Sequence, residues 1–352
     1  MNESSWRKLG KPALRQNANL VLCVRPAHAK KQHADSASST PDETPLSKLG
    51  RADLISDFAA FLPLPAKLEP HLEQALRHVL DHPGSMVRPQ LVLQMALAYD
   101  LPEAAAKGLA IALEYFHTAS LIFDDLPCMD HASMRRGAPC VHRVHGEAGA
   151  ILSALAFINR AYALAWRAVS LCPSSFQQSG LDYLEEHLGI GGLLNGQSLD
   201  LHYATLPHNG GTVERIAIDK TVSLVRLALV LPALLGGAPE EELQLLDQIA
   251  MCWGLSYQIL DDLKDVFDSD AEAGKTVARD ASLDRPNLAL SIGIPGAVQQ
   301  LSSLLAEGDE LLRRLFVAKS GTAFLEKLCG DLKEESARVT ESACEMTLRG
   351  LA

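Results

Sequence analysis

Aromatic residues make up only 5% of this 352-residue sequence, whereas Ala and Leu are abundant. Because aromatic residues favour strands and Ala and Leu favour helices, the composition favours helix over sheet. No segment shows the sustained alternation of apolar and polar residues that marks a half-buried strand, and no internal repeat is evident. With 47% apolar residues, the chain can fill one large core or two modest ones. We therefore expect an all-α protein.

Long apolar runs, cysteine pairs and positive charge are also scarce. The longest apolar run, residues 224–235, contains Arg226 and Pro232 and is too short and too interrupted to span a bilayer. The seven cysteines are odd in number and form no CxxC pair, which indicates a reducing, cytosolic-type compartment rather than a disulfide framework. The formal net charge of −11 argues against general binding of nucleic acid. A cytoplasmic protein without a transmembrane segment is expected.

The first 50 residues differ in composition from the rest of the chain. Residues 4–34 contain no acidic residue but seven Lys and Arg, and a stretch rich in Ser, Thr and Pro follows at residues 35–45. A basic, acid-poor segment is typical of an organelle transit peptide. A disordered tail, or a start codon placed too far upstream, has the same composition. We divide the chain into a basic N-terminal extension, residues 1–50, and a catalytic domain, residues 51–352.

From about residue 54 onwards, one helical pattern follows another. In residues 69–82 the apolar residues recur at i, i+3, i+4, i+7 and i+8, the stripe of an amphipathic helix, and Pro83-Gly84 ends it. This pattern predicts a bundle whose site lies between facing helices. Further helices are expected over residues 87–98, 102–124, 149–171, 179–201, 213–235, 239–265, 286–290, 297–318 and 324–348.

Two clusters of aspartates, LIFDDLPCMD at residues 121–130 and YQILDDLKD at residues 257–265, each end an apolar run. Crowded carboxylates repel each other unless a cation neutralises them, and hard oxygen ligands suit Mg²⁺ that holds a phosphate. A single cluster of this kind also fits a solvated, acidic helix end. Two such clusters, each directly after an apolar helix, predict a shared magnesium site.

The spacing within each cluster constrains its geometry. Asp261 and Asp265 stand at i and i+4 and therefore share one face of a helix. Asp124 and Asp130 lie six residues apart and can share a face only if the helix is distorted or ends between them. Pro127 supplies such a distortion.

Basic residues accompany both clusters. Arg135 and Arg136 begin the segment RRGAP, Lys220 precedes Thr221 in a helical run, and Lys275 lies ten residues after Asp265. A diphosphate bridged by Mg²⁺ still carries charge outside the metal shell, which Arg forks and Lys point charges neutralise. Taken singly, each of these residues fits a surface charge better than a binding role.

The order of these motifs resembles that of the trans-isoprenyl diphosphate synthases, the family of farnesyl and geranylgeranyl diphosphate synthases. The resemblance covers about residues 55–345 and implies an isoprenoid-synthase-type helical bundle around a central cavity, usually a homodimer. It also implies Mg²⁺-dependent, head-to-tail condensation of isopentenyl diphosphate with an allylic diphosphate. The matching segments are PGSMVRP at residues 83–89, EYFHTASLIFDDLPCMD at 114–130, MRRGAP at 134–139, NGQSLDL at 195–201, DKT at 219–221, YQILDDLKD at 257–265 and GK at 274–275.

The same resemblance assigns roles to individual residues. The aspartates of both clusters would hold Mg²⁺ on the allylic diphosphate, and they are Asp124, Asp125, Asp130, Asp261, Asp262 and Asp265. That diphosphate would be surrounded by three cations, Arg135, Lys220 and Lys275. Three polar residues would lie near the reacting carbons, namely Thr221, Gln197 and Gln258. The positions that bind isopentenyl diphosphate match Arg88, His117 and Arg136, although His117 alone also fits a buried core histidine.

The helix before the first cluster would also set product length. Bulky aromatics four and five residues before the cluster stop growth at farnesyl in this family, and here those positions are Ser120 and Ala119. One turn deeper, Phe116 or Tyr115 could form a floor. This arrangement predicts geranylgeranyl diphosphate as the main product, with a farnesyl diphosphate synthase as the alternative.

Three departures from the family pattern bear on activity. Ser85 replaces the lysine of the usual GGKRxRP motif, the acidic patch DNDDLRRG is here DHASMRRG at residues 130–137, and the Gly-Asp pair of the next helix is Ala154-Leu155. They leave open a non-catalytic regulatory subunit that shifts the product length of an active synthase, whereas the intact aspartates favour an enzyme. A terpene cyclase is a third interpretation, disfavoured by the second aspartate cluster and the paired arginines.

Overall fold

The computed structural model describes residues 50–267 and 285–348. This described part is helical apart from turns and one antiparallel pair of two-residue strands, β1 (Met134–Arg135) and β2 (Ala138–Pro139). The prediction of an all-α bundle is confirmed. Most of the proposed N-terminal extension, residues 1–49, and the predicted site residue Lys275 lie outside the described residues.

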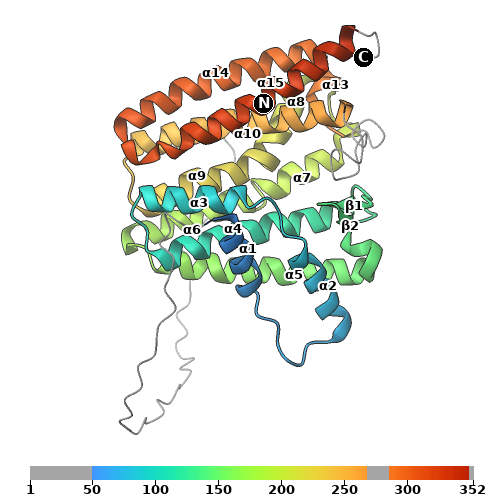
Figure 1. Cartoon of the computed structure of the whole chain (residues 1–352), viewed down its shortest axis with the longest axis vertical. Helices are drawn as coiled ribbons and strands as arrows, with labels where there is room; N and C mark the ends of the chain where they lie inside the picture. Colours follow the sequence, from blue (N-terminus) through green and yellow to red (C-terminus); the bar gives the residue numbers. More distant parts are fainter. Residues whose placement is uncertain (1–49, 268–284, 349–352) are drawn as a thin grey trace, which may run out of the picture. The chain divides into compact units, whose positions relative to one another are not determined.

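Short turns join most of the helices (Figure 1). A π-helical turn, η3 (Ile218–Val222), connects two of them without a break. The described helices are α1 (Arg51–Ala60), α2 (Pro70–Asp81), α3 (Val87–Ala98), α4 (Glu103–Asp124), α5 (Val141–Ser170), α6 (Ser174–Leu188), α7 (Leu193–Leu201), α8 (Gly210–Ala217), α9 (Ser223–Leu235), α10 (Glu240–Phe267), α13 (Leu288–Ile292), α14 (Ile294–Ala318) and α15 (Phe324–Leu348).

Helix α4 lies at the centre of one half of the bundle, because it is apolar on almost every side. It packs against α5, α3, α9 and α1, and most of its residues are buried. A helix that is apolar all round is stable only inside a core. The second half of the bundle consists of α10 packed against α14 and α15 (Figure 1). Helix α9 contacts both α3 and α10 and so joins the halves.

The prediction of one helix over residues 179–201 is wrong, because the chain breaks between α6 and α7. Three glycines lie in this break, and a Cβ atom built on Gly192 would lie 2.5 Å from the carbonyl oxygen of His187. Only glycine permits this close return of the backbone. The helix expected over residues 213–235 is continuous and spans α8, η3 and α9, and its π-helical turn η3 carries Lys220 and Thr221.

Among the described helices, α5 alone has the length and apolar composition that a membrane span needs, yet 39% of its most apolar stretch is buried in the bundle. One side of α5 packs along α4. Its other side leaves a stripe of large apolar side chains between 39% and 61% exposed, namely Ile151, Leu152, Leu155, Tyr162 and Trp166. Residues 224–235, the longest apolar run of the sequence, lie in α9 and are mostly buried.

Candidate active site

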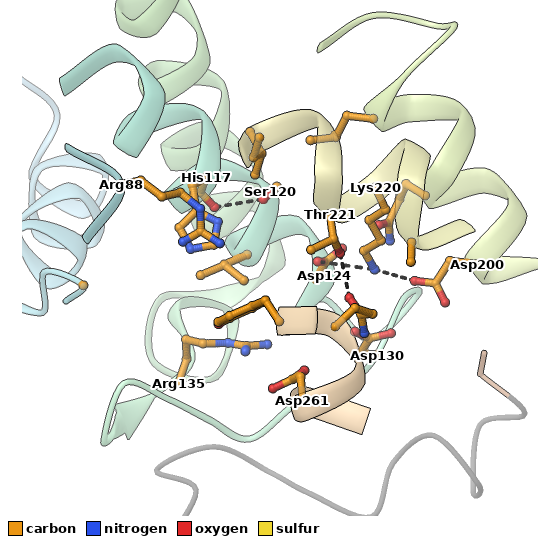
Figure 2. Close-up of a pocket in the computed structure, with 18 of the residues that line it drawn as sticks. Arg88, His117, Ser120, Asp124, Asp130, Arg135, Asp200, Lys220, Thr221 and Asp261 are labelled. Carbon is orange, nitrogen blue, oxygen red and sulfur yellow. Dashed lines mark hydrogen bonds and ion pairs between the residues drawn. The ribbon is translucent and has the colours of Figure 1, made fainter. Parts of the chain in front are cut away.

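A cavity of about 840 Å³ opens where the C-terminal end of α4 faces α7, the turn η3 and α10 (Figure 2). Helix α4 lines it with Glu114, His117, Ser120, Leu121 and Asp124. Residues of both aspartate clusters and of the arginine-containing segments line the same space. The fold therefore brings together segments as far apart in sequence as Arg51 and Pro286.

Asp124 and Asp130 both line this cavity, because α4 ends at Asp124 and the chain then reverses. The backbone N–H of Asp130 donates to the carbonyl of Asp124 at 2.8 Å, which closes the turn. Asp125 does not line the cavity. It is buried and accepts two hydrogen bonds from the Arg135 guanidinium, at 2.6 and 3.0 Å.

The second cluster divides in the same way. Asp261 and Asp265 lie on the face of α10 that lines the cavity, as their spacing requires. Asp262 points elsewhere and is 2% exposed. It accepts hydrogen bonds from the backbone N–H of Leu288, at 2.7 Å, and from the side chain of Gln258, at 2.8 Å, so it ties α10 to α13.

Lys220 joins the first cluster to a carboxylate that the sequence analysis did not single out. Its ammonium lies 3.9 Å from Asp124 and pairs closely with Asp200 of α7 (Figure 2). Burial would lower the pKa of Lys220, but Asp124 and Asp200 outweigh that effect and raise it. The backbone of α7 approaches closely at Gly196, where a Cβ atom would lie 2.5 Å from the backbone nitrogen of Lys220.

Burial raises the pKa of Asp124 to about 6, and the negative charges of Asp130 and Asp200 add to this rise, while Lys220 opposes it. A buried carboxylate among other carboxylates gains most from an additional cation. No group of three His, Cys, Asp or Glu residues within the described ranges lies close enough to hold a metal ion by itself.

Arg285 is a second cavity residue that the sequence analysis missed. Its guanidinium donates to Asp130 at 2.8 Å, to the carbonyl of Met129 at 3.1 Å and to the carbonyl of Asp200 at 3.3 Å. It therefore holds the turn after α4 against α7. No motif surrounds Arg285 in the sequence, because its partners lie up to 156 residues away.

The three polar residues expected near the reacting carbons all line the cavity. The hydroxyl of Thr221 donates to Gln258 at 2.6 Å, and Gln258 in turn donates to Asp262. This chain of hydrogen bonds fixes the orientation of both side chains. Gln197 contacts the sulfur of Met129 at 3.8 Å.

The opposite side of the cavity is basic. Arg88, His117 and Arg136 line it together, from α3, α4 and the hairpin that follows the first cluster. His117 faces the cavity but lies away from bulk water, and this burial, together with Arg88 and Arg136, lowers its pKa well below the usual value. Arg136 lies 3.3 Å from Glu114, a carboxylate whose pKa burial raises.

The four residues considered for product length point in different directions. Ser120 lines the cavity, whereas Ala119 is fully buried and does not. Phe116 packs edge-to-face against Tyr162 and lines a second, small apolar cavity between α4 and α9. Tyr115 is fully buried among Phe58 and Phe157 and donates its hydroxyl to the carbonyl of Phe58 at 2.6 Å.

The chain is similar to known proteins in both sequence and structure. The polyprenyl synthetase family model matches residues 69–314. Geranylgeranyl pyrophosphate synthase 9, chloroplastic, from Arabidopsis thaliana is 35% identical over 246 residues, which cover 68% of each chain. The crystal structure of a geranyltransferase from Helicobacter pylori complexed with magnesium and isoprenyl diphosphate has a TM-score of 0.67 at 25% identity and covers 88% of this chain and 100% of that one. An FPP/GFPP synthase from Zymomonas mobilis has a TM-score of 0.62 at 29% identity and covers 74% and 89%, respectively.

Proposed function

The chain belongs to the polyprenyl synthetase family and is a prenyltransferase, and we propose that it condenses isopentenyl diphosphate head-to-tail with an allylic diphosphate. The observation that carries this proposal is one cavity with two unlike walls. Four aspartates and Lys220 line one wall, and Arg88, His117 and Arg136 line the other. Two diphosphates with different requirements can therefore lie in the same cavity.

Mg²⁺ fits the aspartate wall by the chemistry of its donors. Asp124, Asp130, Asp261 and Asp265 offer hard carboxylate oxygens, and they come from two different elements that face one space. No described group completes a metal site alone, so oxygens of the allylic diphosphate and water would supply the remaining positions. Bound there, Mg²⁺ would neutralise charge on the departing diphosphate.

The protein's own side chains account for the rest of the reaction. Lys220 lies where it can stabilise the leaving diphosphate as the allylic carbon–oxygen bond breaks. The double bond of isopentenyl diphosphate, held by the basic wall, then attacks the allylic cation, and the departed diphosphate takes the proton that is lost. Leu121, Leu193 and Leu224 also line the cavity and would exclude water that would quench the cation.

Geranylgeranyl diphosphate is the proposed main product. The growing chain passes the small side chain of Ser120 and runs between α4 and α9 towards Phe116, whose ring Tyr162 supports. We assign the floor to Phe116 rather than Tyr115, because Tyr115 is held in a separate aromatic cluster. Farnesyl diphosphate remains the product expected if the chain stops above that ring.

A homodimer is part of the same proposal. The exposed apolar stripe on α5 includes Leu155, Tyr162 and Trp166, and these side chains would be covered by a second copy. Of the Ala154-Leu155 departure from the family pattern, Leu155 lies on the outer face of α5 and Ala154 is buried in the core, and neither residue lines the cavity. This departure therefore gives no support to a non-catalytic regulatory subunit. Sedimentation of wild type against Leu155→Asp tests the dimer.

We place the protein in the cytoplasm. The Arabidopsis relative is described as chloroplastic, so import directed by residues 1–50 is the alternative. A fluorescent protein fused after residue 50 separates the two, because only a transit peptide would carry it into an organelle.

Activity is tested with the full-length chain alone. The purified protein is incubated with isopentenyl diphosphate, farnesyl diphosphate and Mg²⁺, and the products are identified by mass spectrometry. We expect geranylgeranyl diphosphate. A regulatory subunit would give no product by itself, and a terpene cyclase would release a hydrocarbon.

A further inference from the structure

Ser85 is the departure from the family pattern that alters the basic wall of the cavity. It lies in the tight turn of residues 83–86 between α2 and α3, and it lines the cavity beside Arg88. The turn is held by Met86, which is buried and has a left-handed backbone (φ 62°). A hydroxyl therefore stands where the resemblance predicts an ammonium group, and the wall has one positive charge fewer.

An arginine from a distant part of the chain reaches this same turn. Arg51, the first residue of α1, lines the cavity, and its Nη2 donates to the carbonyl of Gly84 at 3.3 Å. A guanidinium has five N–H donors, and this bond occupies one of them. Arg51 is 34 residues from Ser85 in sequence, yet its guanidinium bonds to Gly84, the residue directly before Ser85.

Arg136 also contacts this turn. Nη1 of Arg136 donates to the carbonyl of His82 at 3.4 Å, and a Cβ atom built on Gly84 would lie 2.8 Å from Nη2 of Arg136. Gly84 thus lets two guanidinium groups approach one short stretch of backbone. Arg51 and Arg136 lie on the wall to which Ser85 and Arg88 also belong.

The charge on this wall explains why a further cation matters. Glu114 is buried beside Arg136 and offsets part of its charge. His117 contributes little positive charge near neutral pH, because burial and the neighbouring arginines lower its pKa. With Ser85 uncharged, Arg88 and a partly offset Arg136 would be left to hold a diphosphate that carries two to three negative charges.

We propose that Arg51 binds the diphosphate of isopentenyl diphosphate and replaces the cation that Ser85 lacks. This inference rests on the proposed function, since it names a residue for one of that reaction's two substrates. The bond to Gly84 positions the guanidinium at the cavity rim, and its remaining donors suit the planar, forked recognition of phosphate oxygens.

A purely structural role for Arg51 makes different predictions. If Arg51 only held the turn, its loss would disturb Ser85, Arg88 and Arg136 together and lower the melting temperature. If Arg51 binds the diphosphate, its loss weakens binding of isopentenyl diphosphate while the melting temperature stays unchanged. A lysine at position 85 would also replace the lost charge directly, whereas it would not repair a loosened turn.

The test is a double-mutant cycle on the full-length enzyme. Arg51→Ala should raise the KM for isopentenyl diphosphate about tenfold, the scale of one hydrogen bond to a charged group. The KM for the allylic substrate and kcat should change less than about twofold. Arg51→Ala with Ser85→Lys should recover most of the loss, and Arg51→Lys should lose less than Arg51→Ala. Arg77→Ala, an exposed arginine on α2 paired with Glu73, is the matched control and should change neither constant.

Calorimetric titration of isopentenyl diphosphate into the same variants, without allylic substrate, gives the affinities independently of turnover. An unchanged Kd in Arg51→Ala would overturn the inference, as would an equal rise in both KM values. So would a cycle in which Ser85→Lys improves wild type and Arg51→Ala by the same factor. If wild type turns over no substrate yet binds isopentenyl diphosphate through Arg51, the proposed function fails and the binding assignment stands.

Discussion

The two walls of the cavity differ in the charge of the side chains that line them. On the aspartate wall, Lys220 pairs with Asp200 and lies near Asp124, and Arg285 pairs with Asp130. On the basic wall, Arg136 pairs with the buried carboxylate of Glu114, and Arg88 lies near enough to act on the same carboxylate. A diphosphate can bind to the basic wall directly, but it can bind to the aspartate wall only together with a cation. If the protein binds the two proposed diphosphates, the charge of each wall would distinguish them more than its shape would.

The largest expected effect comes from breaking the aspartate wall. Asp124→Ala or Asp261→Ala should lower kcat by at least about 10²-fold, since each removes a preorganised charged group from the leaving diphosphate. Steady-state kinetics with saturating Mg²⁺ measure this effect. Asp81→Ala, an exposed aspartate at the end of α2, is the control and should remain active. Near-normal turnover in both cavity variants would rule out the mechanism.

Product length tests how the cavity continues beyond both walls. Phe116→Ala should lengthen the product, because removing the ring would open the path to the small apolar cavity beside it. Ser120→Phe should shorten it to farnesyl or geranyl diphosphate. Tyr115→Ala is the matched control, since this ring has no access to either cavity. It should lower stability by about 3–5 kcal/mol, as large-to-small aromatic changes in cores do, without altering chain length.

Product profiles by chromatography distinguish these outcomes. If Tyr115→Ala lengthens the product while Phe116→Ala does not, the floor has been assigned to the wrong ring. If Ser120→Phe leaves the distribution unchanged, the chain takes another path.

The pKa of Asp124 makes the aspartate wall a source of instability without metal. Its folded-state pKa of about 6 exceeds the usual value of 3.8, so the folded protein binds this proton more tightly than the unfolded chain does. Stability therefore falls as pH rises between these two values and stays reduced above them. In metal-free buffer, Asp124→Asn should stabilise the protein at pH 7.5 by at most about 3 kcal/mol and have little effect at pH 4. Thermal melts at both pH values measure it, and an equal shift at both would contradict this explanation.

The smallest effects come from shortening the N-terminus. Removing residues 1–48 should leave the melting temperature and both KM values unchanged, because α1 and its preceding Gly50 remain. Removing residues 1–53 should raise only the KM for isopentenyl diphosphate, because Arg51 is lost while the buried Leu54 and Phe58 still pack. If the two deletions gave the same KM for isopentenyl diphosphate, Arg51 would not contribute to binding on the basic wall.

Helical periodicity in the sequence correctly predicted which residues of one helix share a face. The i, i+4 spacing placed Asp261 and Asp265 on one face, and the six-residue gap between Asp124 and Asp130 required the helix end that the structure has. Adjacent residues were harder to separate. Phe116 and Tyr115 differ by about 100° around the helix, and only the packing of α5 and α1 decides which ring faces the small cavity.

Contacts between different helices and loops could not be predicted from the sequence. Arg285 meets Asp130, Lys220 meets Asp200, and Arg51 meets Gly84 only after the helices have packed. Asp125 and Asp262 matched the motif but are turned towards Arg135 and Leu288. A motif identifies which residues cluster along the chain, and the fold decides which of them face the substrate.

The difference between the two walls is tested most directly by measuring each diphosphate alone. Isopentenyl diphosphate and an unreactive thiolo analogue of an allylic diphosphate are titrated calorimetrically into the full-length protein, with Mg²⁺ and with EDTA. We expect the allylic analogue to bind tightly only with Mg²⁺, because the aspartate wall repels it otherwise, and isopentenyl diphosphate to bind with little dependence on the metal. Equal dependence of both ligands on Mg²⁺, or equal independence, would contradict the account.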